Sequence, residues 1–311
     1  MAIDFEIPVE AQAVREKVRQ WVHDECIPAE KELEKGRDFK ELLGALRAKA
    51  RAQGLWLPFI PKEHGGMGLG PLANALVQME LGASHLGALS MNSQGPDDAT
   101  MLTLLAHGTD YQKEKFLKPL LEGEKRVCYS MTEKAAGADA TGMQTRATKD
   151  GNSHYVLNGE KWFSSAASAA DMALVMAMTD PEAPRHQRYS TFIVELPDPG
   201  YMIKRDIPTM AIEGPLSKVM GGGTARSSFA TFGCHPKTSW EAKGTASIWG
   251  STGWPMAACA TACTTSRWPS ARWIWRRRVS PNAQRSGSSC PSGREFSSCS
   301  PSAPANCTWP A

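Results

Sequence analysis

The sequence has few metal-binding or disulfide-forming residues in a recognisable arrangement. Cys26 and Cys128 are the only cysteines before residue 230, and the later ones include no Cys-x-x-Cys pair. The seven histidines contain neither an HxxxH nor an HExxH pattern. These absences argue against a zinc site and against a disulfide framework. We therefore expect no metal centre.

Long hydrophobic runs and a strong excess of one charge are also missing. No apolar stretch is long enough to span a bilayer, and no secretory apolar region follows Met1. The formal net charge of +3 is too small to indicate nucleic-acid binding by itself. We expect a cytoplasmic protein without membrane contact, whose 311 residues allow one large domain or two to three smaller ones.

Residues 1–125 have the apolar spacing of helices, which predicts an all-helical first domain joined by short loops. Pro28 is expected to end the first helix, Gly54 the second and Gly123 the fifth. Glycines between residues 54 and 70 suggest a phosphate-binding loop. However, no strand–loop–helix unit surrounds them, so a structural loop is the preferred interpretation. The predicted helices contain these apolar sets: Val14, Val18, Trp21 and Val22; Leu42, Leu43, Leu46 and Ala50; Leu72, Leu76 and Met79; Met101, Leu104 and Leu105; Phe116, Leu117 and Leu120.

Residues 126–216 change to short strand-like runs separated by Gly, Pro, Asp and Asn, which predicts a compact antiparallel β-sandwich or barrel. The pairs at 150–151 (Asp-Gly) and 158–159 (Asn-Gly) are strong signals for hairpin turns. Strands that meet through such turns would present four side chains on one surface: Tyr129, Thr132, Trp162 and Ser164. Hydroxyls and backbone amides beside a large aromatic ring suit a flat, hydrogen-bonding heterocycle.

The last part of the chain, residues 217–311, lacks what a folded core requires. No leucine follows Leu216, and the only acidic residues beyond it are Glu241 and Glu295. Most of the tryptophans lie there among Ser, Pro, Thr and Arg, without a period of 2 or 3.6. Because a core needs aliphatic side chains to offset chain entropy, we predict a disordered tail.

This composition resembles a GC-rich gene translated out of frame. The hypothesis can be tested by joining the last base of each codon to the first two bases of the next. Single-codon residues fix some outcomes: Trp240-Glu241 must give Gly, and Trp254-Pro255 must give Ala. With permitted codons elsewhere, the shifted text from Ser228 reads FRDVRVPSQDLLGGQGHGFNLG, which has the turns and strands that the printed tail lacks. We infer a frameshift between Ser217 and Gly223.

With these pieces in place, residues 1 to about 216 resemble the acyl-CoA dehydrogenase family. The resemblance is strongest to the branch that forms a domain of the larger acyl-CoA dehydrogenases of types ten and eleven. The Thr-Glu strand and the Asn-Gly-x-Lys-Trp segment at this spacing are the most specific part. The shifted text of the tail also resembles the family's third domain. The segments that carry the resemblance are Gly54-Leu-Trp, Pro61-Lys-Glu-His-Gly-Gly-Met-Gly68, Gly108-Thr, Gln112-Lys113, Leu117-Lys-Pro-Leu, Gly123, Tyr129-Ser-Met-Thr-Glu133 and Asn158-Gly-Glu-Lys-Trp162.

The resemblance implies an α+β fold with a helical N-terminal domain, a central β-domain and a C-terminal four-helix bundle, which this chain lacks. It also implies FAD between the β-domain and that bundle. The residues that the resemblance places beside the flavin or its phosphate are Tyr129, Met131, Thr132, Ala138, Trp162, Phe163 and Ser164. Ala138 stands where many members have serine, and Lys134 replaces the usual proline after Thr-Glu.

The reaction implied by the resemblance is α,β-dehydrogenation of an acyl-CoA thioester, with electrons passed to an electron-transfer flavoprotein. Intact relatives are expected to be homodimers or homotetramers. The catalytic base belongs to the family's bundle, so no printed residue is assigned to it, and Glu133 is interpreted as a structural partner of its loop. Because the bundle supplies half of the flavin pocket, we hypothesise that this polypeptide is inactive as printed.

Two alternatives remain at the sequence level. The first is a folded module of helices and strands without catalysis, which flavin content would distinguish from a dehydrogenase. The second is a DNA-associated flavoprotein relative, for which a basic face would be expected. The basic run at 276–278 (Arg-Arg-Arg) lies in the out-of-frame tail and therefore carries little weight.

Overall fold

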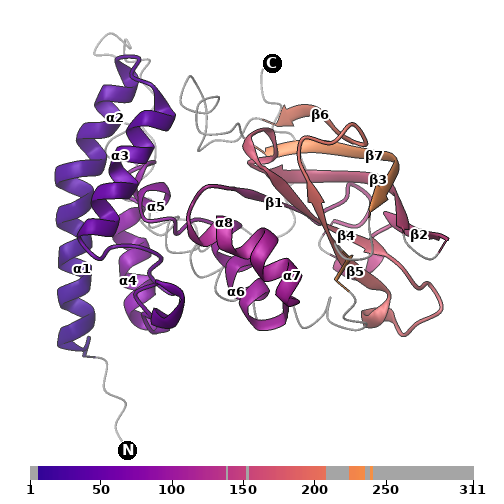
Figure 1. Cartoon of the computed structure of the whole chain (residues 1–311), viewed down its shortest axis with the longest axis horizontal. Coiled ribbons are helices and arrows are strands. Elements are labelled where there is room, and N and C mark those ends of the chain that lie inside the picture. The colour runs from indigo at the N-terminus through magenta and orange to yellow at the C-terminus, as the bar shows by residue number, and fades with distance from the viewer. Residues whose placement is uncertain (1–5, 138, 152–153, 208–223, 235–238, 241–311) are drawn as a thin grey trace, which may run out of the picture. The chain divides into compact units, whose positions relative to one another are not determined.

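The computed structural model describes residues 6–137, 139–151, 154–207, 224–234 and 239–240 (Figure 1). In these residues all α-helices precede residue 122, and all strands follow residue 126. The expected order, a helical region followed by a β-region, is therefore confirmed. No α-helix follows Leu121 within the described ranges, so they contain no C-terminal bundle.

The helical region has four long α-helices, with shorter turns between them and after them. Its α-helices are α1 (Val9–Trp21), α2 (Ile27–Glu34), α3 (Phe39–Ala52), α4 (Pro71–Leu81), α5 (Gly87–Ser90), α6 (Asp97–His107), α7 (Asp110–Gln112) and α8 (Lys118–Leu121). Asp38 caps α3, where its carboxylate accepts the Glu41 N–H at 2.8 Å. Gly54 adopts a left-handed φ of 68° after α3, so the prediction that it closes this helix is confirmed.

Pro28 does not end the first helix, contrary to the sequence-based prediction. A π-helical segment, Val22–Cys26, joins α1 to α2, and the N–H of Ile27 donates to the carbonyl of Val22, five residues back. The wider turn accommodates a proline, which has no N–H for the usual four-residue bond. A second π-helical segment, Lys113–Leu117, precedes Pro119 in the same way and leads into α8.

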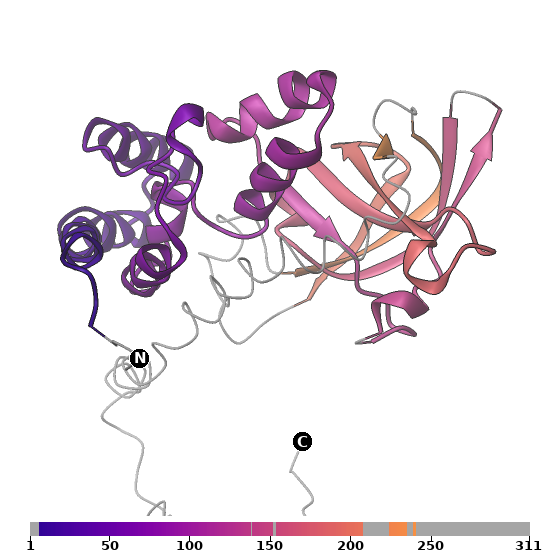
Figure 2. The same cartoon turned by 90° about the horizontal axis from the view of Figure 1, so that it is seen from below.

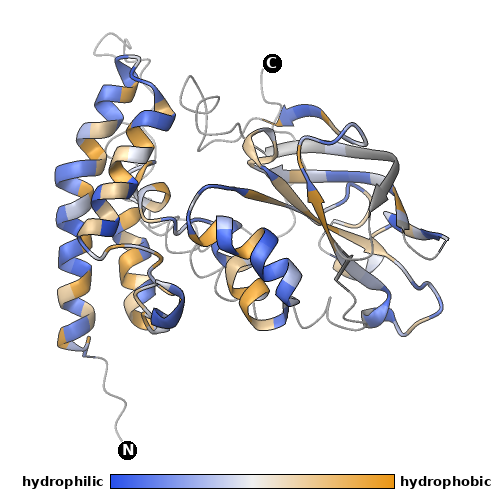
Figure 3. Ribbon diagram, in the orientation of Figure 1, coloured by the Kyte–Doolittle hydropathy of each residue, from blue (hydrophilic) through white to orange (hydrophobic). Residues whose placement is uncertain are grey.

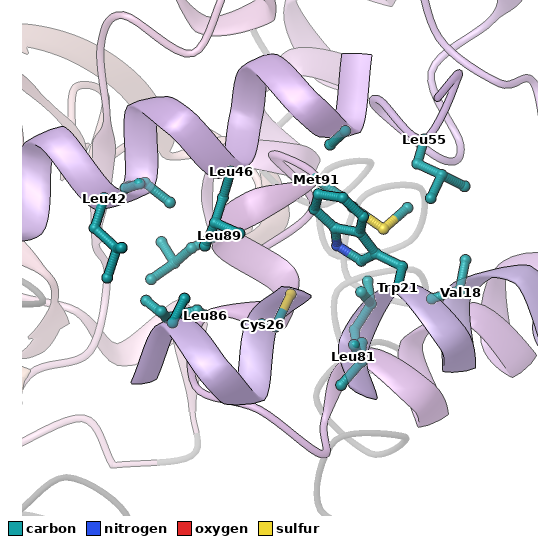
Figure 4. Close-up of a cluster of buried hydrophobic side chains, with 14 of the residues drawn as sticks. Val18, Trp21, Cys26, Leu42, Leu46, Leu55, Leu81, Leu86, Leu89 and Met91 are labelled. Carbon is teal, nitrogen blue, oxygen red and sulfur yellow. The ribbon is translucent and has the colours of Figure 1, made fainter. Parts of the chain in front are cut away.

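Helices α1–α5 enclose one apolar core. Trp21 lies among Val18, Leu55, Leu81 and Met91 in this core (Figure 4), and its indole N–H donates to the Ser90 hydroxyl at 3.0 Å. Hydrophobic residues follow one side of the helices and hydrophilic residues the other (Figure 3). The predicted amphipathic stripes of the first two helices are thus confirmed.

The glycine-rich loop between α3 and α4 is structural, as the sequence analysis preferred. Its amides already have backbone partners: Gly65 donates to Lys62, Gly66 to Pro61 and Gly68 to Ile60. A Cβ at Gly66 would lie 2.0 Å from the Ile60 carbonyl oxygen, so only glycine fits there. With these N–H groups engaged, the loop has no set of free amides to hold a phosphate.

The later helices pack on the first strands of the β-region through a second apolar cluster. Met101, Leu104 and Phe116 share this cluster with Val127 and Leu174. The Asp97 carboxylate at the start of α6 also accepts the Val127 N–H at 2.7 Å, which fixes the start of the first strand, β1 (Val127–Ser130). No helix in the described ranges is long and apolar enough to cross a membrane.

The β-region is an eight-stranded sheet of the order β6-β7-β3-β2-β4-β5-β8, with β1 paired to β4 outside this path. The sheet is twisted and curved (Figures 1 and 2). Its pairs are antiparallel except β1–β4 and β2–β4, which are parallel. The strands are β1 (Val127–Ser130), β2 (Arg146–Asp150), β3 (His154–Ser165), β4 (Met172–Met178), β5 (Tyr189–Glu195), β6 (Tyr201–Ile207), β7 (Thr224–Cys234) and β8 (Ser239–Trp240).

The two predicted hairpin signals have different outcomes. Asp150 pairs with His154 across β2 and β3, so a hairpin does form beside Gly151. The prediction of a turn at Asn158-Gly159 is wrong, because β3 runs through both residues with a register shift against β7. A Cβ at Gly159 would lie 2.4 Å from the Thr145 hydroxyl oxygen. The glycine is therefore needed because Thr145 packs closely against the backbone of β3, and it does not form a turn.

The prediction of a tail without structure from residue 217 is corrected for two segments. Residues 224–234 form β7, which lies between β3 and β6, and residues 239–240 pair with β5. The β7 sequence contains Thr and Phe, which favour strands. Hydrogen bonds between strands are made by the backbone, so this pairing does not require aliphatic side chains. The predicted frameshift interval and residues 241–311 lie outside the described residues.

Candidate functional site

Strand β1 presents alternate side chains to opposite faces of the sheet. Tyr129 packs beside Met176 and donates its hydroxyl to the Met176 sulfur at 3.0 Å, whereas Cys128 and Ser130 face the other side. Burial raises the pKa of Tyr129, so this phenol stays neutral. Tyr129 therefore offers a neutral aromatic ring to this face of the sheet.

Thr132 and Trp162 lie side by side, as the sequence analysis predicted. The N–H of Trp162 donates to the carbonyl oxygen of Thr132 at 2.8 Å. Both residues are half-buried, and no hydrogen bond joins the Thr132 hydroxyl to another described residue. The indole N–H donates to Glu160, and the Arg205 guanidinium lies 5.8 Å from the ring centroid. Within the described part of the chain, a hydroxyl without a hydrogen-bond partner thus stands beside a partly exposed indole.

A β-bulge turns the next residue of β3 toward solvent. Phe163 has a left-handed φ of 58° and is 54% exposed, and the register against β7 shifts between Lys161 and Ser164. A phenylalanine rarely adopts this conformation, and strained residues gather at functional sites. Its ring packs edge-on against Trp162, with the ring centroids 5.9 Å apart. Together the two rings form an exposed aromatic pair.

The Ser164 side chain does not join this surface, contrary to the expectation of one shared face. It is fully buried, and its hydroxyl lies 2.9 Å from that of Ser130, which is 3.0 Å from the Tyr201 hydroxyl. Ser227 of β7 lies 3.5 Å from Ser164. The bulge at Phe163 separates Trp162 from Ser164, because the added residue breaks the two-residue alternation of the strand. These hydroxyls form a closed interior cluster.

Lys161 is the residue that the sequence analysis missed. Its ammonium is fully buried and donates to the Glu133 carboxylate at 2.8 Å and to the Met131 carbonyl at 2.9 Å. Glu133 also accepts the N–H groups of Gln144 at 2.6 Å and Thr145 at 2.9 Å. The interpretation of Glu133 as a structural partner is thus confirmed. The full burial of this lysine is what the sequence did not reveal, because a sequence pattern alone does not show that a strand residue is buried.

Burial disfavours the charged form of both members of this pair, and their mutual attraction opposes it. Burial lowers the pKa of Lys161 to about 8, although the Glu133 charge opposes this shift. For Glu133, burial favours the neutral acid, but the Lys161 charge and the hydrogen bonds outweigh it and lower the pKa. Both groups are therefore charged near neutral pH. Glu133 is fully engaged and cannot serve as a free base.

A cleft of about 460 Å³ opens beside the loop that follows Glu133. It is bordered by the segment Thr141–Gln144 together with Arg146, Met178 and Tyr189. The Arg185 guanidinium pairs with Asp139 at 2.7 Å. This ion pair joins the loop between β4 and β5 to the loop between β1 and β2. Ala138 lies outside the described residues, and Lys134 is exposed.

Comparison with known proteins matches both described regions. The profile of the acyl-CoA dehydrogenase N-terminal domain matches residues 8–124, and that of the middle domain matches residues 128–220. Acyl-CoA dehydrogenase family member 11 of Gallus gallus is 36% identical over 225 residues, which are 68% of this chain and 28% of that protein. This chain thus spans less than a third of that relative's length.

Solved structures show the same similarity. A putative acyl-CoA dehydrogenase from Mycobacterium abscessus aligns with a TM-score of 0.74 and 28% identity, over 84% of this chain and 67% of that one. An acyl-CoA dehydrogenase complexed with FAD from Bacillus anthracis aligns with a TM-score of 0.64 and 25% identity, over 84% and 42% of the two chains. Taken with the two profile matches, these similarities show that the chain belongs to the acyl-CoA dehydrogenase family.

Proposed function

We propose that the surface formed by Thr132, Trp162 and Phe163 is one side of a flavin-binding site. The observation that carries the proposal is the hydrogen bond from the Trp162 N–H to the Thr132 carbonyl, which holds the Thr132 hydroxyl next to a partly exposed indole. A flavin ring needs an aromatic or apolar wall and hydrogen-bond donors at its edge. The FAD-bound relative from Bacillus anthracis supports FAD as the flavin.

The residues present fit such a group. The Thr132 hydroxyl has no partner among the described residues and can donate, while Trp162 and Phe163 supply aromatic surface. Tyr129 and Met131 pack against the apolar cluster that contains Met176 and Met143, and the proposal extends the ring-binding surface to them. The Ser164 hydroxyl is committed to the interior, so we do not assign it a role in recognition.

We further propose that the substrate class is an acyl-CoA thioester, oxidised between its α- and β-carbons. Bound FAD would accept the hydride equivalent of that oxidation. The chain's own described residues would hold and orient the ring and exclude water from one face. An electron-transfer flavoprotein is the proposed electron acceptor, and a homodimer or homotetramer the proposed assembly of intact relatives.

The proposal includes the domain limits 1–125 and 126–216, followed by a tail from residue 217 whose reading frame has changed. Strand β7 extends the folded part of the β-region to residue 234. If the remaining chain supplies no bundle, the second wall of the flavin site is missing. Flavin binding is then weak and the polypeptide has no dehydrogenase activity.

The test is a fluorescence titration of the purified full chain with FAD. We expect saturable binding that is lost on gel filtration, because only one wall is present. Thr132→Val and Trp162→Leu should weaken binding, whereas Leu72→Ala on the exposed start of α4 should not. Absence of saturable binding would contradict the site. A stable yellow protein that bleaches with an acyl-CoA would contradict the inferred loss of activity.

A further inference from the structure

The three residues after β1 are tied to β3 one by one. The strand ends at Ser130, and the carbonyl of Met131 then accepts the Lys161 ammonium at 2.9 Å. The Thr132 carbonyl accepts the Trp162 N–H at 2.8 Å, and the Glu133 carboxylate accepts the Lys161 ammonium at 2.8 Å. Two of the three ties therefore come from one side chain, Lys161.

Lys161 uses all its hydrogen-bonding capacity in this place. An ammonium has three donors, and three acceptors lie around it: the Met131 carbonyl, the Glu133 carboxylate and, at 3.5 Å, the Met143 sulfur. The side chain is fully shielded from solvent. Because no water can replace a lost acceptor, any displacement of residues 131–133 would leave a buried charge without a partner.

The bulge explains why this support is needed. Ladder pairing between β3 and β7 is interrupted between Lys161 and Ser164, where Trp162 and Phe163 together lie opposite one residue of β7. The neighbouring strand therefore does not fix the orientation of these two aromatic residues. The hydrogen bond from the Trp162 N–H to the Thr132 carbonyl joins the bulge to the end of β1 at one point. The Lys161 ammonium adds contacts to Met131 and Glu133, the residues on either side of Thr132.

Glu133 extends the support to a third segment. Its carboxylate accepts the backbone N–H groups of Gln144 and Thr145, which lead into β2. The pair thus joins the end of β1, the middle of β3 and the approach to β2 at one buried point. None of these groups is on the exposed aromatic surface, so the pair acts on that surface only through the backbone.

We propose that Lys161, with Glu133, is a positioning residue for flavin binding, which sets the Thr132 hydroxyl against the Trp162–Phe163 pair. The inference rests on the proposed flavin site. It adds a role for a residue that touches neither the ring nor the substrate. A purely structural role would predict loss of stability alone, whereas positioning predicts a local change at residues 131–133 and 161–163.

The test is the double variant Glu133→Gln/Lys161→Met, which removes both charges and leaves neither unpaired. Hydrogen exchange of the flavin-free protein should be faster in peptides that contain residues 131–133 and 161–165, and unchanged elsewhere in the sheet. FAD affinity should fall at least tenfold. The control is Lys115→Met/Glu195→Gln, which removes a partly exposed ion pair and should change neither quantity.

Local exchange and FAD affinity together decide the inference. Local acceleration of exchange with weaker FAD binding supports it. Unchanged local exchange, or acceleration spread over the whole sheet, overturns it. If the parent chain binds no FAD, the proposed function fails, and exchange at residues 161–165 still reports whether Lys161 positions the segment. If the double variant does not fold, Lys161→Gln replaces it, because its amide keeps two hydrogen-bond donors. We expect this variant to fold and to show a smaller increase of exchange at the same residues. Normal exchange there overturns the inference.

Discussion

Replacement of Glu133 by glutamine is the sharpest test of the energetics of the buried pair. The substitution keeps the shape of the side chain but removes the negative charge opposite Lys161. The ammonium would then remain fully buried with the Met131 carbonyl and the Met143 sulfur as its other acceptors. Removal of one partner of a buried ion pair typically costs about 3–5 kcal/mol, because the remaining charge is uncompensated.

The pH dependence gives the same experiment a second readout. The pKa of Lys161 in the folded protein is about 8, below its ordinary value of 10.5. Between these two values the folded chain binds fewer protons than the unfolded chain, so the contribution of Lys161 to stability rises with pH. Loss of the Glu133 charge should lower the pKa of Lys161 further, so the pH range in which Lys161 affects stability extends to lower pH. The deficit of the variant should therefore shrink as the pH rises from neutral through about pH 8, and should change little at higher pH, where Lys161 is neutral in both folded proteins.

The assay is urea unfolding followed by circular dichroism, at neutral pH and at about pH 9. Glu195→Gln is the matched control, since Glu195 pairs with Lys115 at the surface and such pairs contribute about 0.2–1 kcal/mol. We expect a loss of about 3 kcal/mol or more for Glu133→Gln at neutral pH. An equal, small loss in both variants would refute the interpretation of a desolvated, supporting ion pair.

Three further substitutions test separate parts of the fold by the same unfolding assay. Gly159→Ala should destabilise the protein by about 1–3 kcal/mol, because its Cβ would lie 2.4 Å from the Thr145 hydroxyl oxygen and 2.8 Å from the Thr145 Cα; a neutral effect would contradict the close strand contact. Gly44→Ala, in the exposed middle of α3 with open space around it, should instead stabilise by up to about 1 kcal/mol, and a loss would contradict the helix there. Asp38→Ala should cost about 0.5–2 kcal/mol through loss of the cap on Glu41, whereas Asp38→Asn should retain most of it.

The strong periodic signals in the sequence led to correct predictions. Val18 and Trp21 of α1 and Leu42 and Leu46 of α3 are buried where their spacing placed them. The run Met172–Met178 forms a strand with the predicted limits. Such patterns succeed because burial of one face dominates the local energetics.

Local chain-breaking signals were less reliable. Pro28 sits inside a continuous helical path, because a π turn removes the hydrogen bond that proline cannot make. Asn158-Gly159 lies within β3, where the glycine permits the approach of Thr145. A local π turn at Pro28 and a tertiary contact at Gly159 thus outweighed the preference of each short motif.

The candidate site was predicted in part. The adjacency of Thr132 and Trp162 follows from the paired motifs, and the structure confirms it. The inward orientation of Ser164 could not be predicted, because it depends on a bulge at Phe163 that shifts the alternation of β3. Lys161 was missed for a related reason: the sequence places a lysine in a strand but does not show that the strand buries it.

The central claim is that the end of β1 and the bulge of β3 together form one wall of a flavin site. Hydrogen exchange of the full chain with and without a saturating amount of FAD tests this most directly. The account predicts that FAD slows exchange in peptides covering residues 129–134 and 160–165 and leaves α1–α4 unchanged. Protection that appears only in the helical region, or no protection under conditions where FAD is bound, would contradict it.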